Sequence, residues 1–200
     1  MKHSSHVSIA AVGTALLMGC SVLSPPKAEP ATAILSKVPE DIPRDFGKAV
    51  TLLVRRPETS SAYNTTRMAY SVKPYQLAYY RDNEWAGTPA QMIQPLLVRT
   101  LEQTGMFRAI LSPPETGHTD FALRSEIVEL VQDYTMGPPV LRLRLRLQLF
   151  DASGQPVADR EISEQESMRE STPYGGVNAA NDALAKALRE AAQFVMSSAR

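Results

Sequence analysis

The amino-acid sequence predicts an α+β fold, a two-layer sandwich in which two amphipathic helices pack on one face of a mostly antiparallel sheet. The clearest indication is residues 141–150, where five leucines alternate with polar residues, as in a strand with one buried face. Residues 88–105 and 177–195 instead repeat their apolar side chains at helical spacing. No internal repeat and no second linker interrupts residues 32–200, so we expect this range to form one domain.

The first strands of the sheet are predicted to be short. Residues 49–55 form an apolar run that ends before Pro57, a pattern typical of a buried strand. Residues 32–36 are a further candidate upstream, and residues 106–111 are another short strand downstream. The sheet is therefore expected to combine short strands with the longer ones that follow.

Residues 67–80 are predicted to form a hairpin. Apolar and polar residues alternate on both sides of Lys73-Pro74, and in the simplest register Tyr70 faces Leu77. Lys-Pro suits neither of the usual two-residue hairpin turns, so we expect a wider loop.

Two helices have clear boundaries or faces in the sequence. Thr88 is the expected N-cap of the first, followed by Pro89 and by Gln91, a pattern typical of a capping box. Gly105 should end this helix, and Pro95 inside it should kink it or delay its start. The second helix has a single apolar stripe, formed by Val177, Ala180, Leu184, Ala187, Leu188, Ala191, Phe194 and Val195.

Three long strands should form the main part of the sheet. The apolar phase of residues 121–131 shifts along the segment, which predicts a bulge near Glu126. Residues 141–150 follow, and a turn at 151–154 leads into residues 155–168. The leucines of the middle strand give the sheet its apolar face.

Arginines occupy the polar face of the middle strand, at Arg142, Arg144 and Arg146. A four-residue turn would place Arg146 opposite Asp159, with the next same-face pair alongside, Arg144 opposite Glu161. Cross-strand ion pairing is the favoured interpretation of this stripe. The alternative is that the arginines bind lipid phosphates or an acidic partner.

Composition excludes several functions. The 200-residue chain carries 21 basic and 21 acidic residues, so no net positive charge draws it onto a nucleic-acid backbone, and nucleic acid is not an expected partner. Its single cysteine excludes an internal disulfide, a structural zinc site and a CxxC redox pair. We expect no metal, no cofactor and a stability that depends on an ordinary hydrophobic core.

Catalytic motifs are absent from the sequence, which lacks GxxxxGK[ST], GxGxxG, GxSxG and HExxH. His118 lies in a loop rich in proline and glycine, and a hydrolytic triad can be drawn from it with Ser112 and Asp120. A single histidine in such a loop is far more often solvated than catalytic. The protein is therefore predicted not to be an enzyme.

Residues 1–19 have the features of an export signal. A basic residue precedes a mostly apolar stretch, residues 7–18, that is too short to span a bilayer core of about 30 Å. The ending LMGC, residues 17–20, resembles the lipobox of bacterial lipoproteins. This resemblance implies cleavage before Cys20 and acylation of that residue, and two or more acyl chains hold a protein stably on a membrane.

Residues 20–31 are predicted to combine the acylated Cys20 with a disordered tether, because they are rich in proline and poor in large apolar side chains. Fully extended, the tether reaches about 34 Å, so the domain can stand just off the lipid surface. In lipoproteins, aspartate after the acylated cysteine usually signals inner-membrane retention. Ser21 stands there instead, which implies transport to the outer membrane.

Aromatic side chains are concentrated between residues 63 and 85, where six of them lie. About half must occupy the buried face if this segment forms a hairpin. Tyr63, Tyr80 and Trp85 are the candidates that remain for docking, and we take Tyr80 and Trp85 as the predicted partner-binding residues. For any one of them, core packing is the simpler interpretation.

Five motifs carry a resemblance to a known family and together span nearly all of the exported chain. They are residues 67–70 (RMAY), 74–80 (PYQLAYY), 83–93 (NEWAGTPAQMI), 104–110 (TGMFRAI) and 173–181 (PYGGVNAAN). In these motifs the sequence resembles the ABC-type transport auxiliary lipoproteins, which include the PqiC-like lipoproteins that accompany MCE-domain (MlaD-like) lipid-transport systems. Many members have an acidic residue and then proline after Trp-Ala, whereas Gly87 and Thr88 stand before Pro89 here.

The resemblance implies an accessory subunit, anchored in the outer membrane of a Gram-negative envelope and facing the periplasm. In such a system an ATPase and a permease lie in the inner membrane, and an MCE protein carries lipid across the periplasm. This lipoprotein is then expected to receive or brace the MCE protein without catalysing a reaction, as a monomer or a homo-oligomer.

Two other functions stay open. One is that of a lipopolysaccharide-assembly type lipoprotein bound to an outer-membrane barrel, which also has helices on one face of a sheet, although the tryptophan motif argues against it. The other is that of a periplasmic hydrolase acting through the loop around His118.

Overall fold

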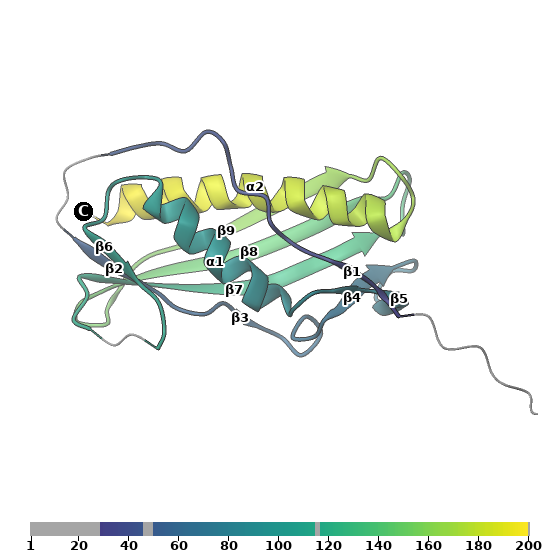
Figure 1. Cartoon of the computed structure of the whole chain (residues 1–200), viewed down its shortest axis with the longest axis horizontal. Coiled ribbons are helices and arrows are strands. Elements are labelled where there is room, and N and C mark those ends of the chain that lie inside the picture. Colours follow the sequence, from purple (N-terminus) through teal and green to yellow (C-terminus); the bar gives the residue numbers. More distant parts are fainter. Residues whose placement is uncertain (1–28, 46–49, 115–116, 200) are drawn as a thin grey trace, which may run out of the picture.

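The computed structural model describes residues 29–45, 50–114 and 117–199. They form two layers, a nine-stranded sheet and two helices that lie on one of its faces (Figure 1). This confirms the predicted α+β sandwich. Cys20 and most of the predicted tether lie outside the described residues.

The elements follow the predicted order. They are β1 (Ala31–Ala33), β2 (Thr51–Val54), β3 (Glu58–Thr59), β4 (Arg67–Ser71), β5 (Ala78–Trp85), α1 (Pro89–Glu102), β6 (Ala109–Leu111), β7 (Phe121–Asp133), β8 (Val140–Asp151), β9 (Pro156–Ser167) and α2 (Pro173–Ser198). Apart from β6, the short strands precede α1 and the long strands follow it.

Strand β7 organises the sheet because both of its edges are paired. On one edge it pairs antiparallel with β8, which in turn pairs antiparallel with β9. On the other edge β2, β3 and β4 pair with it one after another, near Phe121, Glu126 and Gln132. All three strands are parallel to β7. The chain passes from β2 to β3 to β4 in the same direction in which β7 runs from Phe121 to Asp133. The long strands are therefore antiparallel as predicted, and the short ones add parallel pairs.

The bulge predicted in β7 is present, as a shift in its register with β8 between Ile127 and Glu129. The predicted register of β4 and β5 is wrong by one residue, since Tyr70 pairs with Ala78. The loop at 72–77 is wider than the simplest register assumed, and Ser71 Oγ closes it with hydrogen bonds of 2.9 and 2.7 Å to carbonyls inside it.

The register of β8 and β9 is also different, by two residues, since Arg146 pairs with Glu161. The turn between them is tighter than assumed, because the Asp151 N–H donates to the Gln155 carbonyl at 2.9 Å. Gly154, with φ of 80°, supplies the left-handed residue that such a loop needs. The tighter turn accounts for one residue of the difference in register. A register shift between Leu149 and Phe150 accounts for the other.

Helix α1 begins where the sequence predicts. The Thr88 side chain accepts a hydrogen bond from the Gln91 N–H at 3.4 Å, and Gln91 Oε1 accepts one from the Thr88 N–H at 2.9 Å. Pro95 lies inside the helix with an exposed side chain and does not delay its start. Neither helix within the described ranges is long and apolar enough to cross a membrane.

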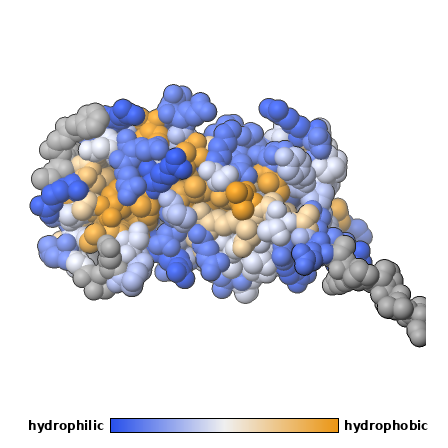
Figure 2. All heavy atoms as spheres, viewed as in Figure 1, coloured by the Kyte–Doolittle hydropathy of each residue, from blue (hydrophilic) through white to orange (hydrophobic). Residues whose placement is uncertain are grey.

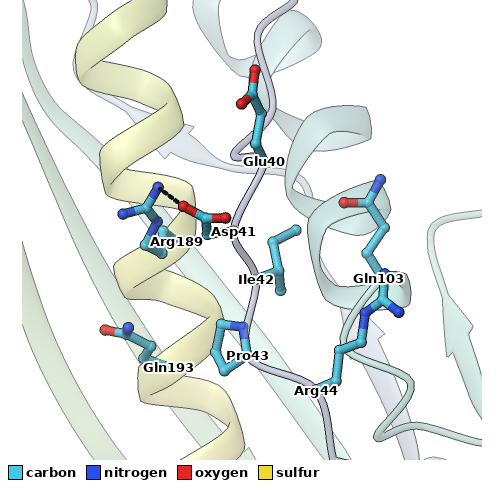
Figure 3. Close-up of a pocket in the computed structure, with 8 residues that line it drawn as sticks. All are labelled: Glu40, Asp41, Ile42, Pro43, Arg44, Gln103, Arg189 and Gln193. Carbon is cyan, nitrogen blue, oxygen red and sulfur yellow. Dashed lines mark ion pairs between the residues drawn. The ribbon is translucent and has the colours of Figure 1, made fainter.

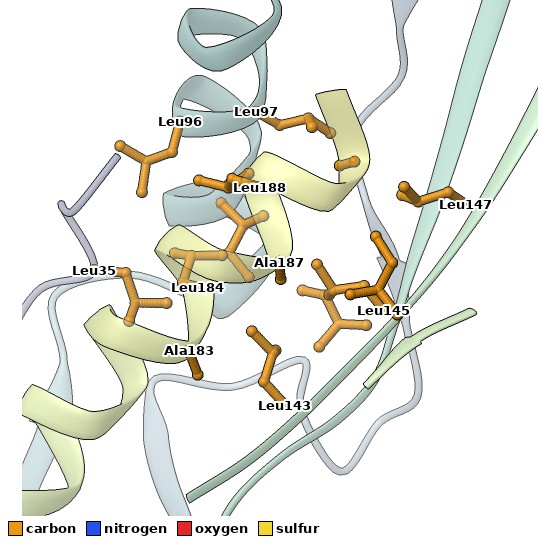
Figure 4. Packing of buried hydrophobic residues seen from close by; sticks show 14 of the residues in the cluster. Leu35, Leu96, Leu97, Leu143, Leu145, Leu147, Ala183, Leu184, Ala187 and Leu188 are labelled. Carbon is orange, nitrogen blue, oxygen red and sulfur yellow. The ribbon is translucent and has the colours of Figure 1, made fainter. Parts of the chain in front are cut away.

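The hydrophobic core lies between the leucine stripe of β8 and α2, and α1 packs beside α2 and adds its buried residues to the same core (Figure 4). All five leucines of the stripe are at most 4% exposed. Alanines on α2 let the helix approach the sheet closely. The predicted apolar stripe of α2 is buried along its whole length, which confirms the predicted face.

An extended segment, residues 34–45, crosses the outer side of the helices, and we call it the strap (Figure 1). Its Leu35 is 5% exposed and joins the core. Seen from this side, hydrophobic surface runs along the middle of the molecule with hydrophilic residues around it (Figure 2). Helix α2 is thus held between the sheet and the strap.

Candidate functional site

The structure separates the two aromatic residues that were predicted to bind a partner. Trp85 ends β5 with 3% of its surface exposed and belongs to the hydrophobic core. An indole at this depth exposes almost no surface to a partner, so the position of Trp85 favours a role in core packing over one in partner binding. Tyr80 lies in the same strand but is only half-buried.

The Tyr80 hydroxyl belongs to a polar junction between the sheet and α2. It lies 2.8 Å from the Tyr134 hydroxyl and donates to Gln132 Oε1 at 3.0 Å. Gln132, 2% exposed, donates from Nε2 to the Pro173 carbonyl at 3.3 Å. We call these four residues the polar junction. Both ends of the buried amide are satisfied, and β5, β7 and the start of α2 are joined through it.

The ring of Tyr80 is also fixed in place. It packs on Tyr70 with the two ring centroids 4.5 Å apart. Burial, followed by the bond to Tyr134, raises the pKa of Tyr80 above its ordinary value. The phenol therefore stays protonated at physiological pH and acts as a hydrogen-bond donor inside the fold.

Two adjacent glycines let α2 approach the polar junction. A β-carbon on Gly176 would collide with the side-chain amide of Gln132, and one on Gly175 would collide with the carbonyl oxygen of Glu170. This contact was not predicted from the sequence. Its signal was present, because glycine costs about 1 kcal/mol inside a helix, so a pair of glycines in a first turn indicates a close approach.

Asn181 of α2 holds the strap against the helix. Its Oδ1 accepts hydrogen bonds from the N–H groups of Ser36 and Lys37 at 2.8 and 3.1 Å. Its Nδ2 donates to the carbonyl of Ile34 at 3.1 Å, and Lys37 forms an ion pair of 2.6 Å with Asp182. The motif at 173–181 therefore supports the fold at both ends, through the polar junction and through the strap.

A hollow of about 510 Å³ lies between the strap and the ends of the two helices (Figure 3). Asp41 of the strap, 3.8 Å from Arg189 of α2, lies at its edge. Apart from Ile42 and Pro43, its lining consists of charged and amide side chains. Such a lining does not suit an acyl chain, which needs mostly apolar walls.

Two ion pairs predicted for the arginine stripe are present. Arg146 lies 3.0 Å from Asp159, and Arg144 lies 3.7 Å from Glu161. Because the register differs by two residues, each pair is diagonal across the strands. The favoured interpretation of the stripe, cross-strand ion pairing, is confirmed.

The strongest partners of the stripe come from β7 and were missed. Glu129 lies 3.0 Å from Arg142 and 2.9 Å from Arg144, and Asp133 lies 3.0 Å from Arg142. The Glu129 and Asp133 side chains are 15% and 9% exposed, so these carboxylates are more buried than the predicted ones. These partners could not be predicted from the alternation of residues in β7, because the bulge changes which residues face the arginines.

The loop around His118 brings its acidic residue into a structural contact. Asp120 Oδ2 accepts hydrogen bonds from the N–H and from Oγ1 of Thr51, at 2.7 and 2.8 Å. These bonds lower the pKa of Asp120 below its ordinary value, while His118 is exposed. Asp120 thus attaches the loop to β2. In the described ranges, no group of three or more His, Cys, Asp or Glu is arranged to hold a metal ion.

Several solved structures share this fold. Protein XCC0632 from Xanthomonas campestris, of family DUF330, is 19% identical with a TM-score of 0.75, over 84% of this chain and 96% of that one. An uncharacterized protein is 15% identical with a TM-score of 0.67, over 84% and 99%. Protein CT253 from Chlamydia trachomatis is 11% identical with a TM-score of 0.53, over 76% and 98%. At these identities the likeness is one of fold.

The family itself is shown by the sequence. No curated protein matches the chain. A family model described as the ABC-type transport auxiliary lipoprotein component matches residues 35–192, a range that includes the strap, both faces of the core and the polar junction. The match covers most of the chain, and the chain therefore belongs to the family of ABC-type transport auxiliary lipoprotein components.

Proposed function

We propose that this protein is an outer-membrane-anchored periplasmic lipoprotein that assists an ABC/MCE-type system in moving lipids between the inner and outer membranes. The observation that carries the proposal is the family match over residues 35–192. A lipobox-like ending at Cys20 and the serine that follows it support the anchor and its outer-membrane location.

In this proposal the protein binds partners and does not catalyse a reaction. Two sets of polar groups that a reaction could use have structural partners: Asp120 is bonded to Thr51, and the arginine stripe is paired with carboxylates. The hollow under the strap is polar and open. An accessory protein of this kind would brace the MCE protein at the membrane, while the ATPase and permease supply the energy and the path.

Of the two residues predicted to bind the partner, Tyr80 is the one we retain. Its ring keeps partial exposure beside Tyr70, whereas Trp85 is enclosed by the core. Tyr80→Phe removes the hydroxyl from the polar junction and keeps the ring. We expect this variant to bind the MCE protein as the wild type does if the ring makes the contact.

The direct test is crosslinking in intact cells, followed by detergent extraction and mass spectrometry of what is bound to the acylated protein. We expect an MCE-domain protein among the crosslinked species. The Cys20→Ala variant is the matched control, because it should remain an unprocessed precursor and lose the MCE crosslink. Recovery of an outer-membrane barrel protein without an MCE protein would instead favour the lipopolysaccharide-assembly function.

The hydrolase alternative has a separate test. A Ser112→Ala/His118→Ala double variant removes two members of the imagined triad from an exposed loop. We expect this variant to support lipid transport in cells as well as the wild type does. Loss of function with an intact fold and normal acylation would contradict the accessory role.

A further inference from the structure

Exposed apolar side chains gather at one end of the molecule. Seven large apolar side chains in the described ranges are exposed, and five of them come from three neighbouring segments: Val72, Tyr75, Leu77, Met136 and Tyr174. The first three lie in the β4–β5 loop, Met136 lies between β7 and β8, and Tyr174 lies in the first turn of α2. We call these five residues the apolar tip.

Backbone and side-chain hydrogen bonds hold the three segments together. The Tyr134 N–H donates to the Ser71 carbonyl at 2.8 Å, which joins the β7–β8 loop to the β4–β5 loop. The Met168 N–H donates to the Pro139 carbonyl at 3.0 Å, and Gln132 is bonded to Pro173, which joins α2 to the same loop. Figure 1 shows these segments at one end of the long axis of the molecule. The three segments that carry the apolar tip are therefore neighbours, next to the polar junction.

Tyr75 is the most prominent residue of the apolar tip. Its side chain is fully exposed, at 107% relative exposure, and its φ is 65°, in the left-handed region that disfavours residues other than glycine. A strained backbone that presents an aromatic ring to solvent is a common feature of binding loops. Tyrosine, with an apolar ring and a polar hydroxyl, is enriched where protein meets the headgroups of a membrane.

The described chain also begins on the side of the apolar tip. Strand β1 is parallel to β5 with Ala31 opposite Asn83, and β5 leads away from the apolar tip, so Glu29 and Pro30 lie from Ala31 toward the tip. Glu29, the first described residue, lies only about nine residues after Cys20, a distance of about 28 Å for a fully extended chain. By comparison, α2 with 26 residues is about 39 Å long and follows the long axis (Figure 1).

These lengths limit how an anchored domain can meet its membrane. A tether of about 28 Å cannot reach along the molecule to its opposite end, so the protein cannot stand on the β8–β9 turn. Of the two ends of the molecule, the one with Tyr75, Leu77 and Met136 is the one that this tether can bring to the lipid. Lys73, exposed in the same loop, adds a positive charge suited to lipid phosphates.

We propose that the apolar tip rests in the headgroup region of the phospholipid membrane that holds the acylated Cys20, so that the domain stands on the membrane with its long axis upright. This inference rests on the anchor in the proposed function. It adds a second membrane contact, made by the folded domain itself, which fixes its orientation and directs the β8–β9 end toward the periplasm.

The test places a fluorescent label at either end of the full-length acylated protein. In Met136→Cys the label lies in the apolar tip, and in Val157→Cys it lies at the opposite end, on a residue that is 44% exposed. The chain's own cysteine is blocked by acylation, so a thiol-reactive bimane labels only the new one. The labelled proteins are bound to vesicles of phosphatidylethanolamine and phosphatidylglycerol, with or without nitroxide groups on the lipid near the headgroup.

We expect the nitroxide lipid to remove most of the bimane emission from Met136→Cys and almost none from Val157→Cys. Adding Tyr75→Ser and Leu77→Ser to the Met136→Cys protein should restore much of that emission, while the acyl anchor keeps the protein on the vesicles. Circular dichroism of the triple variant checks that it is folded.

Each other result overturns the inference. Equal quenching at both ends would mean that the domain lies on its side. No quenching at Met136 despite flotation with the vesicles would leave the anchor and the proposed function intact and remove the membrane contact. A blue-shifted bimane without quenching would mean that protein, such as a second copy of this chain, covers the apolar tip. A chain that is neither acylated nor bound to vesicles would contradict the proposed function as well.

Discussion

Two apolar regions of this molecule have opposite surroundings. The leucine stripe of β8 is covered by α2 and is at most 4% exposed, whereas each side chain of the apolar tip is at least 40% exposed. Residue type alone does not distinguish the two regions, because both consist of large apolar side chains and both contain leucine. The difference lies in position, since the stripe alternates along a strand under a helix and the apolar tip lies in loops. Buried apolar residues build this fold, and the exposed ones are available for contacts outside it.

The largest expected difference between the two regions is in stability. Trp85→Ala removes a core side chain, so we expect the free energy of unfolding to fall by about 3–5 kcal/mol, measured by urea denaturation of the full chain. Tyr174→Ala, in the apolar tip, is the matched aromatic control and should change it by less than about 0.5 kcal/mol. Equal losses would mean that the apolar tip is part of the core.

The junction between the two regions should be sensitive to one methyl group. Gly176→Ala places a β-carbon against the buried amide of Gln132, and we expect a loss of about 1–3 kcal/mol. Gln132→Ala should be destabilising on its own, because it removes the acceptor for Tyr80.

In the Gln132→Ala/Gly176→Ala double variant the collision is gone, so the combined loss should be smaller than the sum of the two single losses. Losses that add within error would contradict the close contact of α2 with β7.

The polar face of the sheet should contribute less than the core. Glu129→Gln removes the charge that pairs with both Arg142 and Arg144, and we expect a loss of about 1 kcal/mol at low salt. The loss should shrink as salt is added, since the arginine side chains are 41% exposed. Arg81→Gln breaks a more exposed pair with Asp82 and should change the free energy of unfolding much less. A loss from Glu129→Gln that does not depend on salt would argue against an ionic cause.

The last expected change in stability has the opposite sign. Tyr75→Gly places glycine at a φ of 65°, so we expect the free energy of unfolding to rise by up to about 1 kcal/mol. The same change should weaken the contact of the apolar tip with lipid vesicles, measured by nitroxide quenching. A loss of stability would show that the ring supports the fold and would set Tyr75 apart from the rest of the apolar tip.

Periodic patterns predicted most of the fold. The alternation of leucine and arginine in β8, the stripe of α2 and the capping box at Thr88 each depend on residues within one element, and each is confirmed. The registers of both hairpins were wrong, because a register depends on the turn. The turns are set by hydrogen bonds from the Ser71 hydroxyl and the Asp151 N–H, which are not visible in a hydrophobic pattern.

The candidate site was predicted less well, for a related reason. Trp85 is 3% exposed and packs in the core at the end of β5, so little of its ring is open to a partner. Glu129 and Gly176 contact residues of other elements, Arg144 and Gln132. A single sequence without homologues does not show which distant residues are in contact. The residues of the apolar tip lie in three separate segments of the sequence, and only the fold shows that these segments are neighbours.

Photocrosslinking in living cells tests most directly whether one end of the domain meets the membrane and the other faces the periplasm. A photoreactive amino acid replaces Met136 in one strain and Val157 in another, and the crosslinked products are identified by mass spectrometry. We expect phospholipid bound at position 136 and none at position 157. Phospholipid at position 157, or protein alone at position 136, would contradict this orientation.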